Sequence, residues 1–154
     1  MIKTEQEYKR TKQMVETEKA AIQDQINKLK EKGFSDNEIK NLMAAGMAIH
    51  EQKKWEVELY ERIKRGDFSG IEHDLGKMLI AFRIYRGMTQ RDLAKKLGVS
   101  PAQVSMDERN EYHGISVSKL ERVMKALGVK AYFKPVEKQG TEPVFDLENN
   151  LVTN

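Results

Sequence analysis

The chain has 154 residues, of which 27 are Lys or Arg, 24 are Asp or Glu and none is Cys. This length allows one domain or two small ones, and the lack of cysteine excludes disulfides, thiolate zinc fingers, iron–sulfur centres and cysteine catalysis. No apolar stretch approaches the roughly 20 residues that span a membrane, and the first ten residues do not form a signal peptide, so we expect a soluble, cytoplasmic protein.

The charge is unevenly distributed along the chain. Residues 71–134 carry 12 basic and 7 acidic side chains, whereas residues 135–154 carry 1 and 4, and the first 70 residues are nearly neutral. Basic segments attract phosphate, and acidic tails are usually solvated. An excess of five positive charges also fits an ordinary charged surface, so nucleic-acid binding requires a motif.

Residues 5–32 contain neither Gly nor Pro and predict one long amphipathic helix. Apolar residues recur every seven positions along it, at Tyr8, Val15, Ile22 and Leu29. A second helix is predicted to begin after Ser35, its N-cap, with Glu38 in the first turn completing a capping box, and to end near residue 65. The short connection makes the two helices antiparallel neighbours. Because two such helices bury little surface alone, we expect the hairpin of residues 1–65 to pack against another copy or against the following domain. Its expected role is dimerisation or partner binding.

Residues 66–70 are predicted to be a linker, and a series of short helices follows it. Capping residues and glycines place them at about residues 71–87, 89–98, 101–109 and 117–128. Thr89 and Ser100 are the predicted N-caps of the second and third, and Asn110 is expected to end the third in the left-handed conformation. Two short helices joined by a glycine-containing turn form a helix-turn-helix.

LIAFRIYRGMTQRDLAKKLGVSPAQVSMDERN, followed by SVSKLERVMKALGV, resembles the lambda-repressor-like (XRE, Cro/CI-type) helix-turn-helix family of bacterial and phage regulators. The resemblance covers about residues 71–130. It implies an all-α, five-helix DNA-binding domain in which helix 101–109 is the recognition helix. It also implies a structural ion pair between Arg83 and Glu108.

The resemblance also assigns the residues that would meet double-stranded DNA. Thr89 and Gln90 open the helix that touches the DNA backbone, where free N–H groups attract phosphate. Pro101, Ala102, Ser105 and Met106 face the bases. The full candidate DNA-binding set is Thr89, Gln90, Arg91, Ser100, Pro101, Ala102, Gln103, Ser105, Met106, Arg109, Asn110, Tyr112 and His113, with Lys95 and Ser118 as further possible phosphate contacts.

The recognition helix departs from the family at several positions. Pro101, Ala102 and Met106 cannot form bidentate hydrogen bonds with bases, although they can contact thymine methyl groups. Asp107 occupies a position that is usually apolar. Gln103 either reads a base or completes a capping box with Ser100. We therefore expect weak direct readout, with affinity supplied by phosphate contacts and DNA shape.

The C-terminal segment, residues 131–154, is expected to contain short strands and an acidic tail. Val129, Ala131 and Phe133 alternate as in an edge strand, and residues 141–146 are its candidate partner. The rest is expected to be a loose tail.

Three functions fit these features. The first is a dimeric repressor on a pseudo-palindromic operator, since one recognition helix covers only a half-site. The second is the antitoxin of a toxin–antitoxin pair, with the hairpin or the C-terminal segment binding the toxin. The third is a protein-binding module on a helix-turn-helix scaffold. We do not expect the protein to be an enzyme, because no nucleophile–base pair is identifiable. We also expect no cofactor or metal site, since His50, His73 and His113 lack paired metal-ligand spacing.

Overall fold

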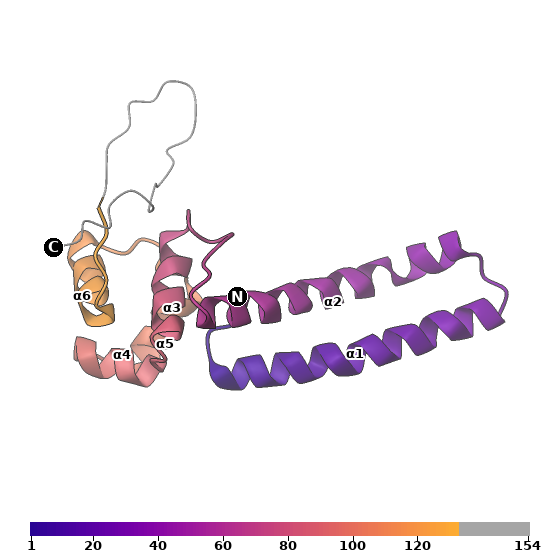
Figure 1. Cartoon of the computed structure of the whole chain (residues 1–154), viewed down its shortest axis with the longest axis horizontal. Helices are drawn as coiled ribbons and strands as arrows, with labels where there is room; N and C mark the ends of the chain where they lie inside the picture. Colours follow the sequence, from indigo (N-terminus) through magenta and orange to yellow (C-terminus); the bar gives the residue numbers. More distant parts are fainter. Residues whose placement is uncertain (133–154) are drawn as a thin grey trace, which may run out of the picture. The chain divides into compact units, whose positions relative to one another are not determined.

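The structure, a computed structural model, describes residues 1–132 (Figure 1). Within this range the chain forms six α-helices and no strand. It divides into two compact units, and the boundary between them in the sequence lies between Arg62 and Ile63. Residues 129–132 have no regular secondary structure. The remainder of the expected strand, its partner at 141–146 and the acidic tail lie outside the described residues. None of the helices in residues 1–132 is long and apolar enough to cross a membrane.

The first unit is built from α1 (Glu5–Glu31) and most of α2 (Asp36–Lys64), which lie side by side and antiparallel (Figure 1). Thr4 caps α1 by accepting a hydrogen bond from the backbone N–H of Glu7. Before α2, the backbone N–H of Ser35 donates to Glu38 Oε2 at 2.9 Å, and the backbone N–H of Glu38 donates to Ser35 Oγ. These contacts satisfy N–H groups that a helix start leaves without partners.

Polar and aromatic contacts join α1 to α2 along their length. The rings of Tyr8 and Tyr60 stack with their centroids 4.8 Å apart, and the Tyr8 hydroxyl donates to Glu61 at 2.6 Å. Near the middle, Glu18 pairs with Lys53. The apolar contribution is small, because no residue of α1, which is described throughout, is buried. The seam that repeats every seven residues therefore stays partly exposed to solvent.

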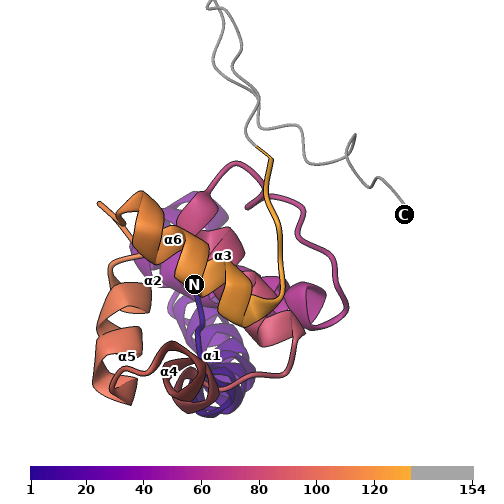
Figure 2. The ribbon, with the colours of Figure 1, turned by 90° about the vertical axis from the view of Figure 1, so that its left-hand side faces the viewer.

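The second unit holds α3 (Leu75–Tyr85), α4 (Gln90–Leu97), α5 (Pro101–Arg109) and α6 (Val117–Leu127) (Figure 2). The described part of this unit thus has four α-helices where the resemblance implies five. The expected helix from residue 71 begins later, at Leu75, because Asp74 accepts a hydrogen bond from the backbone N–H of Lys77 at 2.9 Å and caps it. Residues 71–73 form a turn instead.

A compact apolar core holds these four helices together. Helix α4 packs against α5 and α6, and α3 packs against α6. Almost no solvent reaches the side chains at the centre, which are Leu79, Ile80, Ala81, Leu93, Ala94, Val104, Val123 and Leu127. Burial of each large apolar side chain is worth about 1.5–3 kcal/mol. This core determines the angle at which α5 lies on the rest of the unit.

Candidate nucleic-acid interface

The turn between α4 and α5 sets the direction of the candidate recognition helix. Gly98 ends α4 with a positive φ of 68°, a conformation that costs glycine little. Ser100 then caps α5 by accepting a hydrogen bond from the backbone N–H of Gln103 at 3.1 Å. Pro101 occupies the first helical position, where its missing N–H is not needed. The chain therefore turns between α4 and α5 (Figure 2), and the first residues of α5 are exposed.

Helix α5 has one buried face and one exposed face. Val104 and Glu108, four residues apart, are buried against the core. Pro101, Ala102 and Met106 are exposed and Ser105 is half-buried, so all four base-facing candidates reach the surface, as does Gln103 beside them. Met106 is 62% exposed. The outward face of the N-terminal half of α5 is thus mostly apolar.

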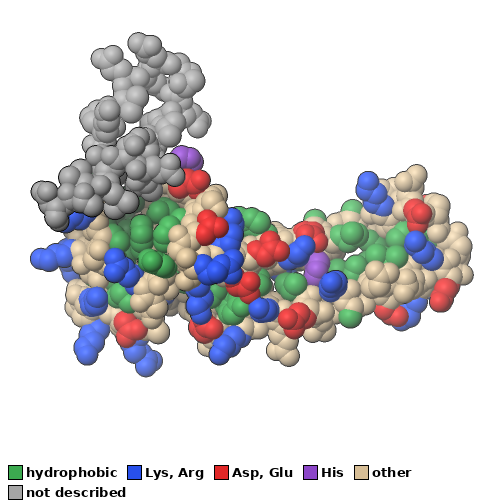
Figure 3. Space-filling model, in the orientation of Figure 1, with side chains coloured by type: hydrophobic (Ala, Val, Ile, Leu, Met, Phe, Trp, Pro, Cys, Tyr) green, Lys and Arg blue, Asp and Glu red, His purple; other side chains and the backbone are tan. Residues whose placement is uncertain are grey.

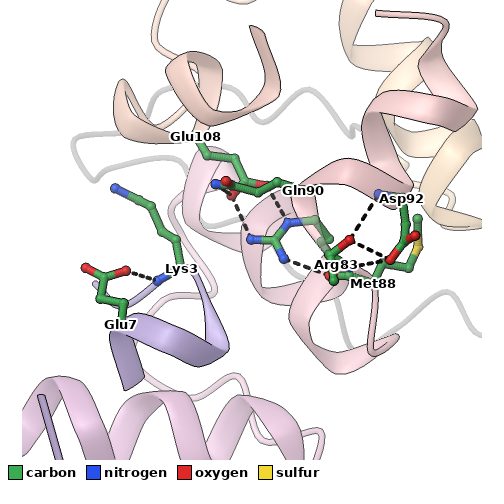
Figure 4. A network of polar contacts seen from close by, with 8 residues as sticks. Lys3, Glu7, Arg83, Met88, Gln90, Asp92 and Glu108 are labelled. Carbon is green, nitrogen blue, oxygen red and sulfur yellow. Dashed lines mark hydrogen bonds and ion pairs between the residues drawn. The ribbon is translucent and has the colours of Figure 1, made fainter. Parts of the chain in front are cut away.

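A buried ion pair fastens α5 to α3. Arg83 donates through Nε and Nη2 to the two carboxylate oxygens of Glu108, at 2.5 and 2.7 Å, and through Nη1 to the carbonyl of Met88 at 2.8 Å (Figure 4). Both side chains are almost completely buried. The bidentate geometry satisfies both carboxylate oxygens, as a buried charge requires. The structure thus brings Arg83 and Glu108 together as the resemblance implies.

Gln90 joins the same network. Its amide nitrogen donates to Glu108 Oε2 at 2.9 Å, so the start of α4 is tied to α5 (Figure 4). This side chain is only partly exposed. Gln90 therefore holds α4 and α5 in position relative to each other. The amide atoms that do not bind Glu108 are those available to a phosphate.

The start of α4 is closed by a complete capping box. The backbone N–H and the hydroxyl of Thr89 donate to Asp92 Oδ2 at 2.8 and 2.6 Å, and the backbone N–H of Asp92 donates to Thr89 Oγ1 at 3.1 Å. The hydrogen bonds from Thr89 lower the pKa of Asp92. Arg91, beside this cap, is exposed. A helix N-terminus with an exposed arginine next to it suits a phosphate group.

Asp107 does not present a free negative charge on the recognition helix. Its Oδ1 accepts hydrogen bonds from Lys119 Nζ at 2.7 Å and from the amide of Gln103 at 3.0 Å. Sequence reasoning missed Lys119, which lies on α6, because no spacing along the chain links it to Asp107. It also offered two roles for Gln103, whereas the side chain binds Asp107 and no capping bond from it to Ser100 appears in the described residues.

The other candidate phosphate contacts divide into exposed and buried residues. Arg109, Asn110 and His113 are exposed, as are Lys95 and Ser118. Tyr112 is only 6% exposed, and burial raises the pKa of its hydroxyl, with the charge of Glu108 adding to the effect. This burial favours the packing of Tyr112 in its loop, the alternative to a phosphate contact, because little of the residue reaches solvent. Asn110 has a φ of −85°, and the left-handed residues are Glu111 and Tyr112 instead.

The described residues contain no group of three or more His, Asp or Glu side chains that could hold a metal ion. His113 is exposed in the loop after α5, and Glu72, His73 and Asp74 precede α3.

Comparison with known proteins identifies the motif. Residues 79–133 match the family model described as Helix-turn-helix, the family that the sequence resembles. The match runs from α3 through α6 and includes every candidate DNA-binding residue. It supports a DNA-binding helix-turn-helix regulator. No curated protein and no solved structure matches the chain.

Proposed function

We propose that this protein is a sequence-specific transcriptional repressor that binds a pseudo-palindromic operator as a dimer. The observation that carries this proposal is the geometry of α5. Its N-terminal residues are exposed, while the buried Arg83–Glu108 pair and Gln90 hold the helix in a fixed orientation. A rigid, exposed helix of this kind fits the major groove, which admits one α-helix.

Phosphate contacts position the domain on DNA. The N-terminus of α4, with Thr89, Gln90 and Arg91, offers backbone N–H groups and a guanidinium to one phosphate region. Arg109 and Asn110, exposed at the other end of α5, offer a second. Contacts with phosphates supply affinity that does not depend on sequence and that falls as salt rises.

Base recognition relies on apolar contacts. Ala102 and Met106 are exposed on the same face, four residues apart, and contact thymine methyl groups. Gln103 is the long polar side chain at the surface, and Asp107 orients its amide. The operator is therefore expected to contain thymine at the positions beneath Ala102 and Met106.

Lys119 removes an electrostatic repulsion between α5 and DNA. An unpaired Asp107 would repel the phosphates that flank the groove. Because the ammonium of Lys119 lies 2.7 Å from its carboxylate, the pair has no net charge. Lys119 is thus a positioning residue that acts through Asp107.

The test is selection of bound duplexes from a random pool, followed by fluorescence anisotropy across salt concentrations. Arg91→Ala should weaken binding to all duplexes and reduce the salt slope by about one. Arg10→Ala, which removes an exposed arginine from α1, serves as the control and should bind as the wild type does. Equal loss in both variants, or no enriched sequence, would overturn the proposal.

An antitoxin is a second candidate, and the exposed Trp55 and Met47 on α2 favour it. Trp55 is 47% exposed and Met47 is 42% exposed. Tryptophan is enriched at the centres of protein interfaces. In this case a small basic protein encoded beside the gene would copurify with the chain, and Trp55→Ala would weaken that complex without changing DNA affinity.

A protein-binding role for α5 is the third candidate, since exposed Met106 and Ala102 also suit a protein partner. Under this alternative, the double substitution Gln90→Ala and Arg91→Ala would leave function unchanged. Under the proposed function it would abolish operator binding.

A further inference from the structure

We infer that α2 forms an antiparallel, two-fold symmetric contact with α2 of a second copy, centred on Ala45 and Gly46. This inference rests on the dimeric part of the proposed function and names the surface responsible. The following contacts belong to the first unit alone.

Two of the large apolar side chains that α2 exposes lie on one face of the helix. Leu42 is 60% exposed and Ile49 is 56% exposed. Residues seven apart in a helix lie on the same face, so both side chains belong to one stripe, with Ala45 and Gly46 between them. The neighbouring stripe, with Ile39, Met43 and His50, is buried. Figure 3 shows hydrophobic side chains at the surface along this unit.

Gly46 has no packing role among the described residues. It lies inside α2, where glycine costs about 1 kcal/mol relative to alanine. A Cβ atom built at this position would have no described heavy atom within 4 Å, beyond its own helix and chain neighbours. Small residues let two helices approach closely, so the crossing of a second helix at this point explains the glycine.

The stripe is complementary to itself. An antiparallel contact centred between Ala45 and Gly46 pairs Leu42 with Ile49 of the second copy, and Glu38 with Lys53 of the second copy. The apolar residues meet at the centre, and opposite charges meet at both ends. Isologous contacts require this pattern, because the same patch serves both subunits. Lys53 also pairs with Glu18, so a second carboxylate would share its ammonium.

The contact has a defined length. An antiparallel pairing centred between Ala45 and Gly46 places Asp36 of one copy opposite Trp55 of the other, so the two copies of α2 overlap over about 30 Å. Leu42 and Ile49 lie near the middle of this overlap. A second copy therefore supplies the cover that these two side chains lack.

Cysteine cross-linking of the full chain tests the position of the axis, because the chain contains no native cysteine. Under mild oxidation, Ala45→Cys should yield a disulfide-linked dimer, since each copy places residue 45 beside the axis. Trp55→Cys is the control, because its side chain is also exposed but lies about ten residues, or about 15 Å, from the axis. Cross-linking of the control as fast as Ala45→Cys would overturn the inference.

Sedimentation analysis separates this inference from the proposed function. The double substitution Leu42→Glu and Ile49→Glu should turn a dimer into a monomer and weaken operator binding at least tenfold, whereas Trp55→Glu should leave the dimer intact. If the double variant remains dimeric and binds the operator, the surface is wrong while the repressor proposal stands. If the wild type is dimeric through α2 and binds no DNA, the proposed function fails instead.

Discussion

Arg83 and Glu108 form a bidentate ion pair in the core of the second unit, with 3% and 0% of their side chains exposed. The pair joins the first helix of this unit to the candidate recognition helix, and Gln90 adds a third partner. The orientation of α5 and the stability of the second unit therefore depend on the same contact.

Removal of one partner of this pair should destabilise the second unit strongly. Glu108→Ala leaves the Arg83 guanidinium buried without its carboxylate, which costs about 3–5 kcal/mol. Urea unfolding followed by circular dichroism measures this loss. The double substitution Arg83→Met and Glu108→Leu removes both charges and should recover much of the stability. A cost below about 1 kcal/mol for the single variant would contradict this account of the pair.

Lys119→Met should weaken operator binding because it exposes the phosphates to the charge of Asp107. Asp107→Asn in the same chain should restore most of the affinity, since the repulsion then disappears. Anisotropy titrations at low and moderate salt measure both effects. Lys125→Met, which removes an exposed lysine from the same helix, is the control. Additive effects of Lys119→Met and Asp107→Asn would show that the two residues act independently.

Gly76→Ala should destabilise the second unit because no space exists for a methyl group. A Cβ atom at this position would lie 1.9 Å from the carbonyl oxygen of Glu111. That oxygen belongs to the backbone, so the loop after α5 must shift, at a cost of about 1–3 kcal/mol or more. Thermal unfolding measures the change. An unaltered unfolding midpoint would mean that the loop moves freely.

The capping box of α4 should make stability depend on pH in the acidic range. The folded-state pKa of Asp92 is lowered by the hydrogen bonds from Thr89, so its stabilising effect is complete above the unfolded pKa of about 3.9 and is lost as pH falls through the lower folded value. Asp92→Asn should therefore reduce stability more at pH 7 than at about pH 3. Urea titrations at both pH values give the two differences, and equal differences would contradict the assignment.

Local signals were sufficient to predict the helices of the second unit. Thr89 and Ser100 are N-caps, and Gly98 and Gly128 end helices in the left-handed conformation, because each acts on its own neighbours in the chain. The predicted start of α3 at residue 71 is too early, because Asp74 caps the helix.

Contacts between distant residues could not be predicted in the same way. The pairing of Asp107 with Lys119 and the burial of Tyr112 depend on how α5 and the loop after it pack on the core. Tyr112 is polar at one end and apolar at the other, so its sequence position alone fits both a phosphate contact and a core residue. Only the three-dimensional arrangement decides between these roles.

Selection from a random pool of duplexes, with the wild-type full chain at low salt, tests the central claim most directly. The account predicts enrichment of an inverted repeat whose half-sites lie about 10–10.5 base pairs apart, or a multiple of that spacing, and which binds two protomers. A pool that shows no enriched sequence after repeated rounds, with binding that depends only on salt, would contradict it.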